Sequence, residues 1–386
     1  ECSAGVVGGR AQILSRAIPA AAGDRYKALQ SGSGAAVLSL ELTQVIAMAR
    51  MGVVLLLGLW AALARGGTAA PLLFDRSNAE PLRVELAAPL QAIARDSDPE
   101  PESRPGTLTL LDSEERFAVA LKPRGKSRRQ RSNCSFPPLW VEMKKADVKD
   151  TSLAGHHRRK LVTHCEALTR RSRDASKVWI EMLAYRALNL LTDYSFRVQP
   201  LRITYRDTAR PEKTYDHPGF LIEHKRELAR RLDLRPVDGN RLSLSTLAPT
   251  HASLVTLFNL LIGNADFSIL QGPPGDDCCH NSVPLMAADG STYSIIYDFD
   301  NTGLVNPRYA MPSEALRMRS VKKRVYRGYC RHNPELAANL AAFAGRQAAI
   351  EALFSEHPEI SRAEKKLIVR FLHQFFNSYT LELSQR

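Results

Sequence analysis

The stretch from Phe258 to Gly303 constrains the chemistry of this chain more than any other part of its sequence. An apolar run leads into a glycine-containing turn that carries Asp266. A loop rich in glycine, proline and aspartate follows and ends at Asn281. A hydrophobic strand then leads to Asp298, within the letters YDFDNTG. The stretch therefore presents, in this order, a carboxylate, a carboxamide beyond a loop, and a second carboxylate at the end of a strand.

Phosphoryl transfer from a nucleotide uses these groups in this order, because an acid orients the attacking hydroxyl while oxygen ligands hold a metal ion on the phosphates. We predict that Asp266 orients the hydroxyl, although an aspartate in such a turn also commonly caps the turn. Asn281 and Asp298 are predicted metal ligands, because hard cations prefer oxygen, and Mg²⁺ or Mn²⁺ is the expected ion. Asp300 is a candidate second metal ligand or a helix cap, and His280 is expected to support the loop.

Three further residues are candidates for binding ATP. Lys160 lies on a predicted strand ahead of a predicted helix that carries Glu181, and kinases use such a lysine–glutamate pair to position nucleotide phosphates. Glu181 lies among large apolar residues, where an unpaired charge is costly. Glu223 ends the strand-like GFLIE segment, either beside the nucleotide base or as a solvated acid at a strand end. The basic turn around Gly125 is a candidate for backbone contacts to phosphates, or an exposed hairpin.

Hydrophobic periodicity predicts strands in the first part of the folded region and helices afterwards. Alternating apolar residues favour short strands from residue 107 onwards. One helix is expected at Ala175–Leu191, and a short one at Leu82–Ala94. We therefore predict an α+β fold with a sheet-rich part and a mainly helical part. The expected segments are an N-terminal segment and linker at 71–106, the sheet-rich part at 107–225 and the helical part at 226–386.

Residues 51–70 have the pattern of a secretory signal peptide. Met51 is followed by an apolar run and then by small residues, with cleavage expected near Ala69 and Ala70. The apolar run is too short for a comfortable membrane span, so no stable span is expected, and an uncleaved anchor is the alternative. Residues 1–50 are interpreted as an upstream extension outside the fold. The protein is therefore expected to be secreted or periplasmic.

Export favours disulfides over a zinc site for the cysteines that follow this segment. No two well-formed CxxC pairs are present in the sequence. We expect Cys134 to pair with Cys165, and either Cys278 or Cys279 to pair with Cys330. Spacing alone does not determine the connectivity.

The net charge of +13 is concentrated in two runs, at residues 122–131 and 317–331. No recognised nucleic-acid module or interleaved aromatic pattern accompanies them, so we expect no nucleic-acid partner. Most of this charge is interpreted as solvated. Attraction of phosphate or of an acidic substrate is the alternative.

The segments LLIGNADFS, CCHN and YDFDNTGLV, preceded by KLVTHC and a helix with alanine, glutamate and tyrosine, together resemble the atypical protein-kinase-like superfamily. They are most similar to bacterial secreted kinase-like proteins of the CotH and HipA types, over residues 116–330. The resemblance implies a two-lobed protein-kinase-like fold with a sheet-rich N-lobe and a mainly helical C-lobe. It also implies ATP, a divalent metal and γ-phosphoryl transfer to a hydroxyl, with a protein as the expected substrate. Asp266 then matches the catalytic aspartate, Asn281 the metal-binding asparagine and Asp298 the aspartate of the DFG-type motif.

Other functions fit parts of the same pattern. The sequence has no HRD and no GxGxxG, so a catalytically inactive, nucleotide-binding pseudokinase is one alternative. The letters SIIYDFDNTG also match the DxDxT of haloacid-dehalogenase-type phosphatases, in which Asp298 would attack phosphate and Asp300 would protonate the leaving group. The helical pattern after Gly303 argues against that phosphatase fold. An exported, disulfide-stapled binding protein without catalysis is a third possibility.

Overall fold

The computed structural model describes residues 73–75, 80–169, 174–239, 241–273 and 277–383. All the described residues belong to one compact unit. The expected upstream extension (1–50) and signal peptide (51–70) lie outside the described residues. Among the helices of the described part, none is long and apolar enough to span a membrane.

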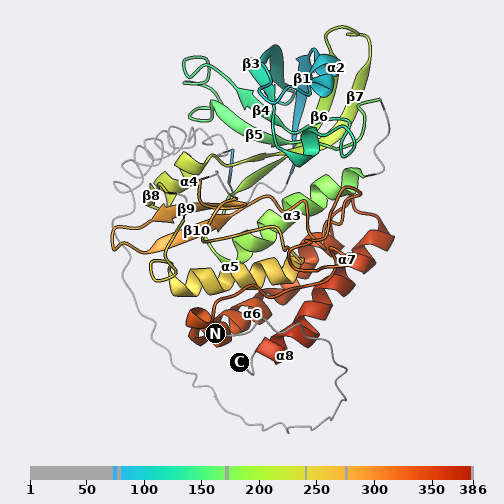
Figure 1. Cartoon of the computed structure of the whole chain (residues 1–386). Helices are drawn as coiled ribbons and strands as arrows, with labels where there is room; N and C mark the ends of the chain where they lie inside the picture. Colours follow the sequence, from blue (N-terminus) through green and yellow to red (C-terminus); the bar gives the residue numbers. More distant parts are fainter. Residues whose placement is uncertain (1–72, 76–79, 170–173, 240, 274–276, 384–386) are drawn as a thin grey trace, which may run out of the picture. The chain divides into compact units, whose positions relative to one another are not determined.

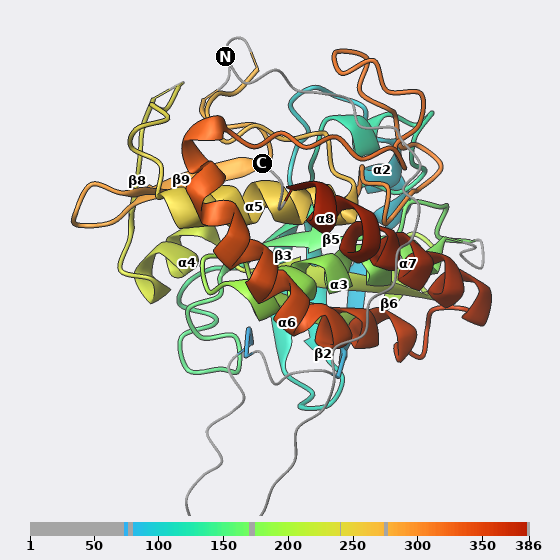
Figure 2. The same ribbon diagram turned by 90° about the horizontal axis from the view of Figure 1, so that it is seen from below.

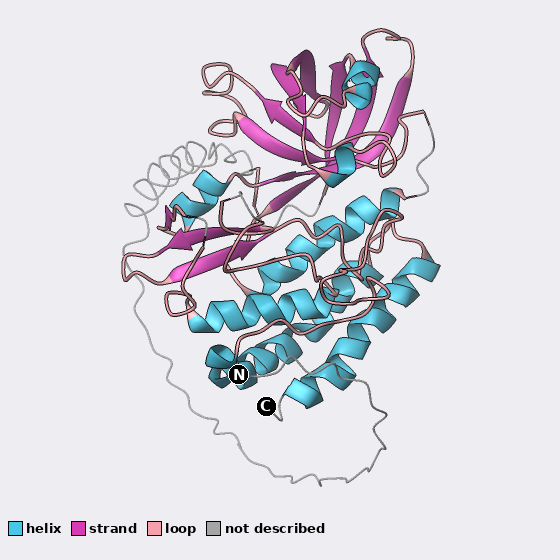
Figure 3. Cartoon of the chain, in the orientation of Figure 1, coloured by secondary structure: helices cyan, strands magenta, loops and turns pink. Residues whose placement is uncertain are grey.

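Seven strands of the described chain close into a barrel, drawn in magenta at the top of Figure 3. Neighbouring strands are antiparallel except for β1 and β6, whose parallel pairing closes the barrel. The barrel begins inside residues 71–106, which we expected to be an N-terminal segment and linker. In order around the barrel, the strands are β1 (Leu82–Ala88), β2 (Arg104–Leu110), β3 (Arg116–Pro123), β4 (Leu139–Glu142), β5 (Arg158–Val162), β7 (Thr214–Ile222) and β6 (Val198–Asp207).

Side chains alternate along these strands between the barrel interior and its outer surface. In β3, Phe117, Val119 and Leu121 are buried, whereas Arg116 is exposed. The inward-facing residues of the strands, including Leu86 of β1, form one apolar cluster. The alternation that predicts the strands therefore also fills the barrel.

The predicted two-lobed protein-kinase-like fold is wrong, because the strands form this closed barrel and are accompanied by a small separate sheet and by helices. The helix predicted at Leu82–Ala94 is wrong over its first half, which is strand β1. Only α2 (Leu90–Arg95) is helical. Both errors have one cause. A pattern within one segment identifies a strand but not its partner, and the pairing that closes the barrel joins Leu82 to Leu201.

The remaining elements form a small antiparallel sheet and a group of helices. They are α3 (Ala175–Leu191), α4 (Lys225–Arg231), β8 (Arg235–Pro236), α5 (Pro249–Ile262), β9 (Ser282–Met286), β10 (Thr292–Ile296), α6 (Leu336–Ser355), α7 (Arg362–Gln374) and α8 (Thr380–Leu383). Helix α3 lies against the barrel strands β6 and β7 and also against α6 (Figure 1). Figure 2 shows α6 and α7 on the side of α3 that faces away from the barrel.

Two helices are buried to an unusual degree. Helix α3 has the bounds that the sequence predicts, and eleven of its residues are buried. In α5, every residue from His251 to Ile262 is buried. A helix that is apolar on all sides belongs inside a large core rather than at its surface. These two helices therefore form the central layer of the second apolar cluster.

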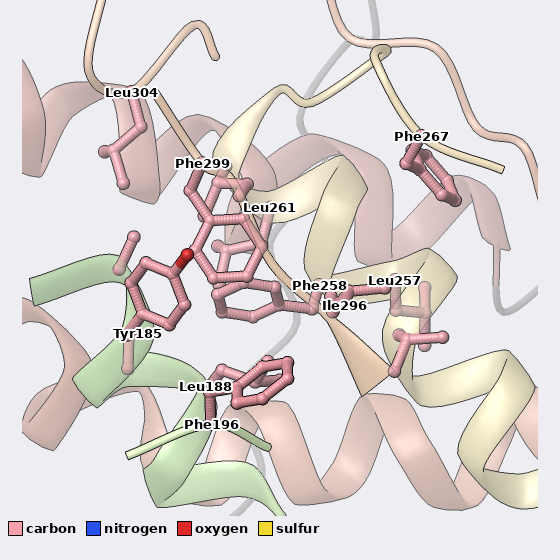
Figure 4. Packing of buried hydrophobic residues seen from close by; sticks show 14 of the residues in the cluster. Tyr185, Leu188, Phe196, Leu257, Phe258, Leu261, Phe267, Ile296, Phe299 and Leu304 are labelled. Atoms are coloured by element: carbon pink, nitrogen blue, oxygen red, sulfur yellow. The ribbon is translucent and has the colours of Figure 1, made fainter. Parts of the chain in front are cut away.

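An aromatic group joins α3 and α5 to the segment that follows β10. The ring centroid of Phe299 lies 4.5 Å from that of Tyr185 and 5.6 Å from that of Phe258. Figure 4 shows these three rings together inside the cluster. Phe299 is fully buried. Its ring therefore fixes the neighbouring residues, Asp298 and Asp300, at the edge of the core.

Disulfides connect two pairs of cysteines in the described chain. Cys134 pairs with Cys165, as predicted. Cys278 pairs with its neighbour Cys279, so the expected pairing of one of these two with Cys330 is wrong. Spacing did not favour a bond between adjacent residues. Disulfides are typical of oxidising compartments, which fits the expected export.

Candidate functional site

The two turns that carry the predicted acidic residues are joined through their backbones. Helix α5 ends at Gly263, whose φ of +66° lies in the left-handed region that favours glycine. The backbone N–H of Gly303 donates to the Gly263 carbonyl over 3.0 Å. A Cβ atom on Gly263 would lie 3.4 Å from the Gly303 Cα atom, so the two chains touch. Asp266 follows one glycine and Asp300 precedes the other, which brings both loops to one place.

The carboxylate of Asp266 is held by residues from the end of the long loop. His280 Nε2 donates to Asp266 Oδ1 over 2.6 Å, and Asn281 Nδ2 donates to the Asp266 backbone carbonyl over 2.7 Å. Burial raises the pKa of Asp266, but hydrogen bonds from His280 and Asn301 and the charge of His280 lower it below its ordinary value. The hydrogen bond to Asp266 raises the pKa of His280. The Asp266 side chain is 43% exposed, so the site offers an ionised carboxylate that a hydroxyl group can reach.

Asp298 and Asp300 lie just beyond the end of β10. The backbone N–H of Asp298 donates to the Tyr185 hydroxyl over 2.8 Å. The Tyr309 hydroxyl donates to Asp300 Oδ2 over 2.8 Å. Burial and the negative charge of Asp298 raise the pKa of Asp300 to about 6. The two carboxylates therefore repel each other, and a cation bound between them would relieve that repulsion.

Glu181 of α3 lies beside an arginine that the sequence analysis did not single out. Arg128 Nη1 lies 4.0 Å from Glu181 Oε2, and Arg128 Nη2 donates to the Thr163 carbonyl over 2.5 Å. Burial raises the pKa of Glu181 well above its ordinary value, Asp300 raises it further, and Arg128 opposes the rise. The expected pairing of Glu181 with Lys160 is not among the ion pairs of the described residues. Arg128 is the cation beside Glu181 instead.

Lys160 of β5 lies within electrostatic reach of the acidic group without contacting Glu181. Its Nζ atom is 4.4 Å from the ring centroid of Tyr297 and 5.7 Å from that of Trp140. Burial lowers the pKa of Lys160 to about 7; the charge of Arg124 lowers it further, whereas Asp298 raises it. Near neutral pH, the protonated and neutral forms of Lys160 are therefore similarly populated. A bound anion would favour the protonated form.

Glu223 directly follows Ile222, which pairs with Lys160 between β5 and β7. Its Oε1 atom accepts from Arg231 Nε over 2.9 Å, and its Oε2 atom accepts from the backbone N–H of Arg197 over 3.1 Å. Glu223 is 6% exposed. These contacts connect the end of β7 to α4 and to the start of β6. Its carboxylate is thus already paired within the protein, and Glu223 is not among the residues that line the two pockets at Asp266.

The acidic residues share a pocket of about 130 Å³ with the basic loop that follows β3. The loop is the turn around Gly125 that the sequence marked as a possible phosphate contact. The pocket is lined by Arg124, Gly125, Lys126, Ser127, Arg128, Pro138, Val162, Glu181, Asp266, Asp298, Asp300, Asn301, Tyr309 and Met311. It therefore combines four carboxylates with three cations in one small space.

A second pocket of about 190 Å³ adjoins the first. Asp266, Asn301 and Met311 line both pockets, whereas Asp298 and Asp300 line only the first. Met311 is 69% exposed. Asp266 is thus located where the two pockets meet.

Larger or more enclosed spaces elsewhere in the molecule lack this chemistry. A pocket of about 530 Å³ lies between the outer face of the barrel and α3. Arg202 in its wall is already paired with Glu359, and Arg83 with Asp112. A cavity inside the barrel measures about 30 Å³, which is room for about one water molecule. The reactive side chains therefore concentrate at the smaller acidic pocket.

No protein-family model matches this chain. A search of curated proteins found no similar protein. The fold and the pocket define a barrel-containing protein with carboxylates facing a basic loop. Its function has to be argued from the geometry of that site.

A metal ion fits the site only in part. Among the described residues, no group of three or more His, Cys, Asp or Glu side chains is arranged to hold a metal ion. Asp298 and Asp300 nevertheless repel each other, and both raise the pKa of Glu181. Mg²⁺ commonly takes one or two carboxylates and fills its other positions with water and phosphate oxygens. The donor set is therefore suited to an ion that arrives with a phosphorylated ligand.

Three residues of the site were not predicted, and only one had a readable signal. Tyr185 follows Glu181 by four positions on a helix, and that spacing places both on one face. Arg128 lies in the run KSRRQR, where one buried arginine looks the same as its exposed neighbours. Tyr309 lies in an irregular segment without periodicity, so no pattern distinguishes it from its neighbours.

Proposed function

We propose that this protein is a metal-dependent phosphotransferase that transfers the γ-phosphoryl group of ATP to a hydroxyl group of a protein. The observation that carries the proposal is the position of Asp266, an ionised and accessible carboxylate at the junction of two pockets. One pocket combines carboxylates with a basic loop, as a metal ion and phosphates require. The other offers space on the far side of Asp266 for an acceptor side chain.

Charge complementarity supports phosphate binding in the first pocket. Arg124, Lys126 and Arg128 come from one loop, and Asp298 and Asp300 from another. Cations would hold phosphate oxygens, and the two aspartates would hold the metal ion that neutralises the transferred group. A pocket of about 130 Å³ is smaller than the roughly 300 Å³ that a complete small-molecule site occupies, so the nucleoside would extend beyond it.

Asp266 is suited to orient a hydroxyl rather than to act as a strong base. Its pKa lies below the ordinary value, which makes it a weak proton acceptor. Phosphoryl transfer depends mainly on positioning and on electrostatic stabilisation, because its transition state is loose. A carboxylate fixed by His280 can therefore align the acceptor through a hydrogen bond.

Asn281 would act from the same loop. Its Nδ2 atom donates to the Asp266 carbonyl, which fixes the orientation of the side-chain amide. Asn281 is not among the residues that line either pocket, and its Oδ1 atom is the oxygen that would remain for a cation at their edge. The predicted role of Asn281 as a metal ligand is thus retained in the proposal, with a positioning role toward Asp266 added to it.

The phosphatase alternative lacks structural support. Haloacid-dehalogenase-type catalysis by Asp298 and Asp300 belongs to a parallel sheet with alternating helices. Here Asp298 follows β10 of an antiparallel sheet. After Gly303, the described chain up to residue 383 contains helices and no strand. We therefore do not propose this activity.

Incubation of the purified protein with labelled ATP, Mg²⁺ or Mn²⁺, and a set of acceptor proteins tests the proposal. We expect metal-dependent label transfer that disappears in Asp266→Asn. Metal-dependent nucleotide binding without transfer to any acceptor would instead support the inactive, nucleotide-binding alternative. Absence of nucleotide binding in the presence of either metal would overturn both.

A further inference from the structure

A short basic segment borders the second pocket, which Asp266 lines but Asp298 and Asp300 do not. We call residues 317–323 the basic strap. Met318 and Val321 of the strap are each 8% exposed and line the pocket. The charged residues of the strap are all exposed cations, namely Arg317, Arg319, Lys322 and Lys323. The strap thus turns its apolar side chains to the pocket and its positive charge to solvent.

Two arginines, Arg324 (buried) and Arg327 (partly buried), fix the strap to the site. Arg324, directly after the strap, donates to the backbone carbonyls of Leu260 over 2.8 Å and Phe371 over 2.6 Å. Arg327 donates to the carbonyls of Ala265 and Phe267, the two residues that flank Asp266. These contacts connect the strap to the end of α5 and to the turn that carries the reactive carboxylate. The exposed cations are therefore held at a defined position relative to Asp266.

The strap also lies directly against the turn between Asp300 and the helical region. A Cβ atom on Gly303 would lie 2.7 Å from the Val321 carbonyl oxygen and 3.0 Å from the Lys322 Cα atom. Gly303 leaves no room for a side chain here, because a Cβ atom would be too close to the backbone of the strap. Lys322 directly follows Val321, which lines the second pocket.

The side-chain charges of the strap have no partner among the described residues. Among the residues that the structure describes, no side-chain ion pair or hydrogen bond involves any of the four exposed cations of the strap. Between residues 308 and 323 the sequence has one acidic residue, Glu314, against Arg308 and the four strap cations. Unpaired like charges at fixed positions repel one another, and an acidic partner would relieve that repulsion.

Building on the proposed function, we propose that the basic strap binds an acidic segment of the protein substrate and thereby directs a neighbouring serine or threonine hydroxyl into the second pocket. The distances are suitable, because charge acts over about 8–10 Å at physiological salt and the strap borders the pocket itself. A nucleic acid fits less well. Residues 313–323 contain no aromatic side chain on which a base would stack.

Peptide binding measured by fluorescence anisotropy tests this role without requiring catalysis. The probe is a short labelled peptide with one serine flanked by glutamates, and the comparison peptide has glutamines in their place. The test variant is Arg317→Gln/Arg319→Gln/Lys322→Gln. The matched control is Lys144→Gln/Lys145→Gln/Lys149→Gln, which removes the same charge from the exposed loop after β4. Pro138, which lines the first pocket, precedes β4, so this loop follows the opposite end of the strand.

We expect the unmodified protein to bind the acidic peptide about tenfold more tightly than the glutamine peptide, which corresponds to about 1.4 kcal/mol. The test variant should lose this preference, while the control variant and Asp266→Asn should keep it. Equal affinity for both peptides, an equal loss in the control variant, or tighter binding of a labelled oligonucleotide than of the acidic peptide would each overturn the inference. Because binding is measured directly, a failure of phosphotransfer would leave these results interpretable.

Discussion

The hydroxyl group of Tyr185 accepts the backbone N–H of Asp298 over 2.8 Å. Tyr185 lies one helical turn after Glu181, so α3 both supplies a buried carboxylate to the site and fixes the turn that carries Asp298. Burial raises the pKa of Tyr185 well above its ordinary value, so the hydroxyl stays neutral. Helix α3 packs against the barrel on one side and against α6 on the other. The position of Asp298 therefore depends on how the barrel and the helices pack together.

Replacing Tyr185 with phenylalanine should weaken this connection. Loss of the acceptor leaves a partly buried N–H group without a partner, which costs about 1–3 kcal/mol in unfolding free energy. Metal-dependent ATP binding should weaken by about tenfold, because the turn at Asp298 is no longer fixed. Denaturant unfolding and calorimetric titration measure the two effects. Tyr215→Phe, in β7 of the barrel, is the matched control and should leave ATP affinity unchanged; an unchanged affinity in Tyr185→Phe as well would refute the link.

The buried contact between Arg128 and Glu181 should show strong coupling. Removing Arg128 leaves the Glu181 carboxyl group buried without its partner, and a buried polar group without a partner costs about 1–3 kcal/mol. We expect Arg128→Gln to be destabilised by about this amount, and Glu181→Gln added to it to restore part of the stability. Neither variant should regain phosphotransfer, because Arg128 also faces the phosphate pocket.

Denaturant unfolding of the single and double variants gives the coupling energy. Arg83→Gln is the matched control, because Arg83 pairs with Asp112 on the surface, where ion pairs contribute little. Strictly additive effects of the Arg128 and Glu181 substitutions would contradict the assignment.

Lys160 should make nucleotide binding depend on pH. Its pKa of about 7 means that the free protein loses the Lys160 proton as pH rises above 7. ATP phosphates favour the protonated form, so the dissociation constant should rise toward about tenfold per pH unit above 7. An arginine at this position stays charged, so Lys160→Arg should bind with little dependence on pH in the same range.

The effect of Lys160 on folding has the opposite sign. Between pH 7 and the ordinary lysine pKa of 10.5, the unfolded chain holds a proton that the folded protein lacks. The contribution of Lys160 to the unfolding free energy therefore rises with pH in this window. Weaker binding at high pH would then not result from unfolding. Calorimetric titrations from pH 6 to 9 check the prediction, and an equal pH dependence in Lys160→Arg would contradict it.

Local patterns in the sequence predicted single elements well. The periodicity of Ala175–Leu191 gave the bounds of α3, because a helix repeats within its own residues. The turn at Asp266 and the loop end at His280 were also identified, and the structure brings these two side chains into contact. Such features are determined by neighbours in the chain.

Features that depend on distant partners were not predictable in this way. The barrel closes through the pairing of β1 with β6, and alternation in Leu82–Ala88 contains no information about that partner. Glu181 was expected beside Lys160, but Arg128 lies there instead. A buried arginine and an exposed one look alike in a basic run, because burial is decided by the packing of the whole chain.

The central claim is that Asp298 and Asp266 serve one reaction in different ways, and it is tested most directly by measuring both ATP binding and phosphotransfer in two variants. Calorimetric titration with ATP and Mn²⁺ should show that Asp298→Ala has lost metal-dependent binding. Asp266→Ala should bind ATP normally and transfer no phosphate. If both variants transfer phosphate at the rate of the unmodified protein, the proposed function is contradicted.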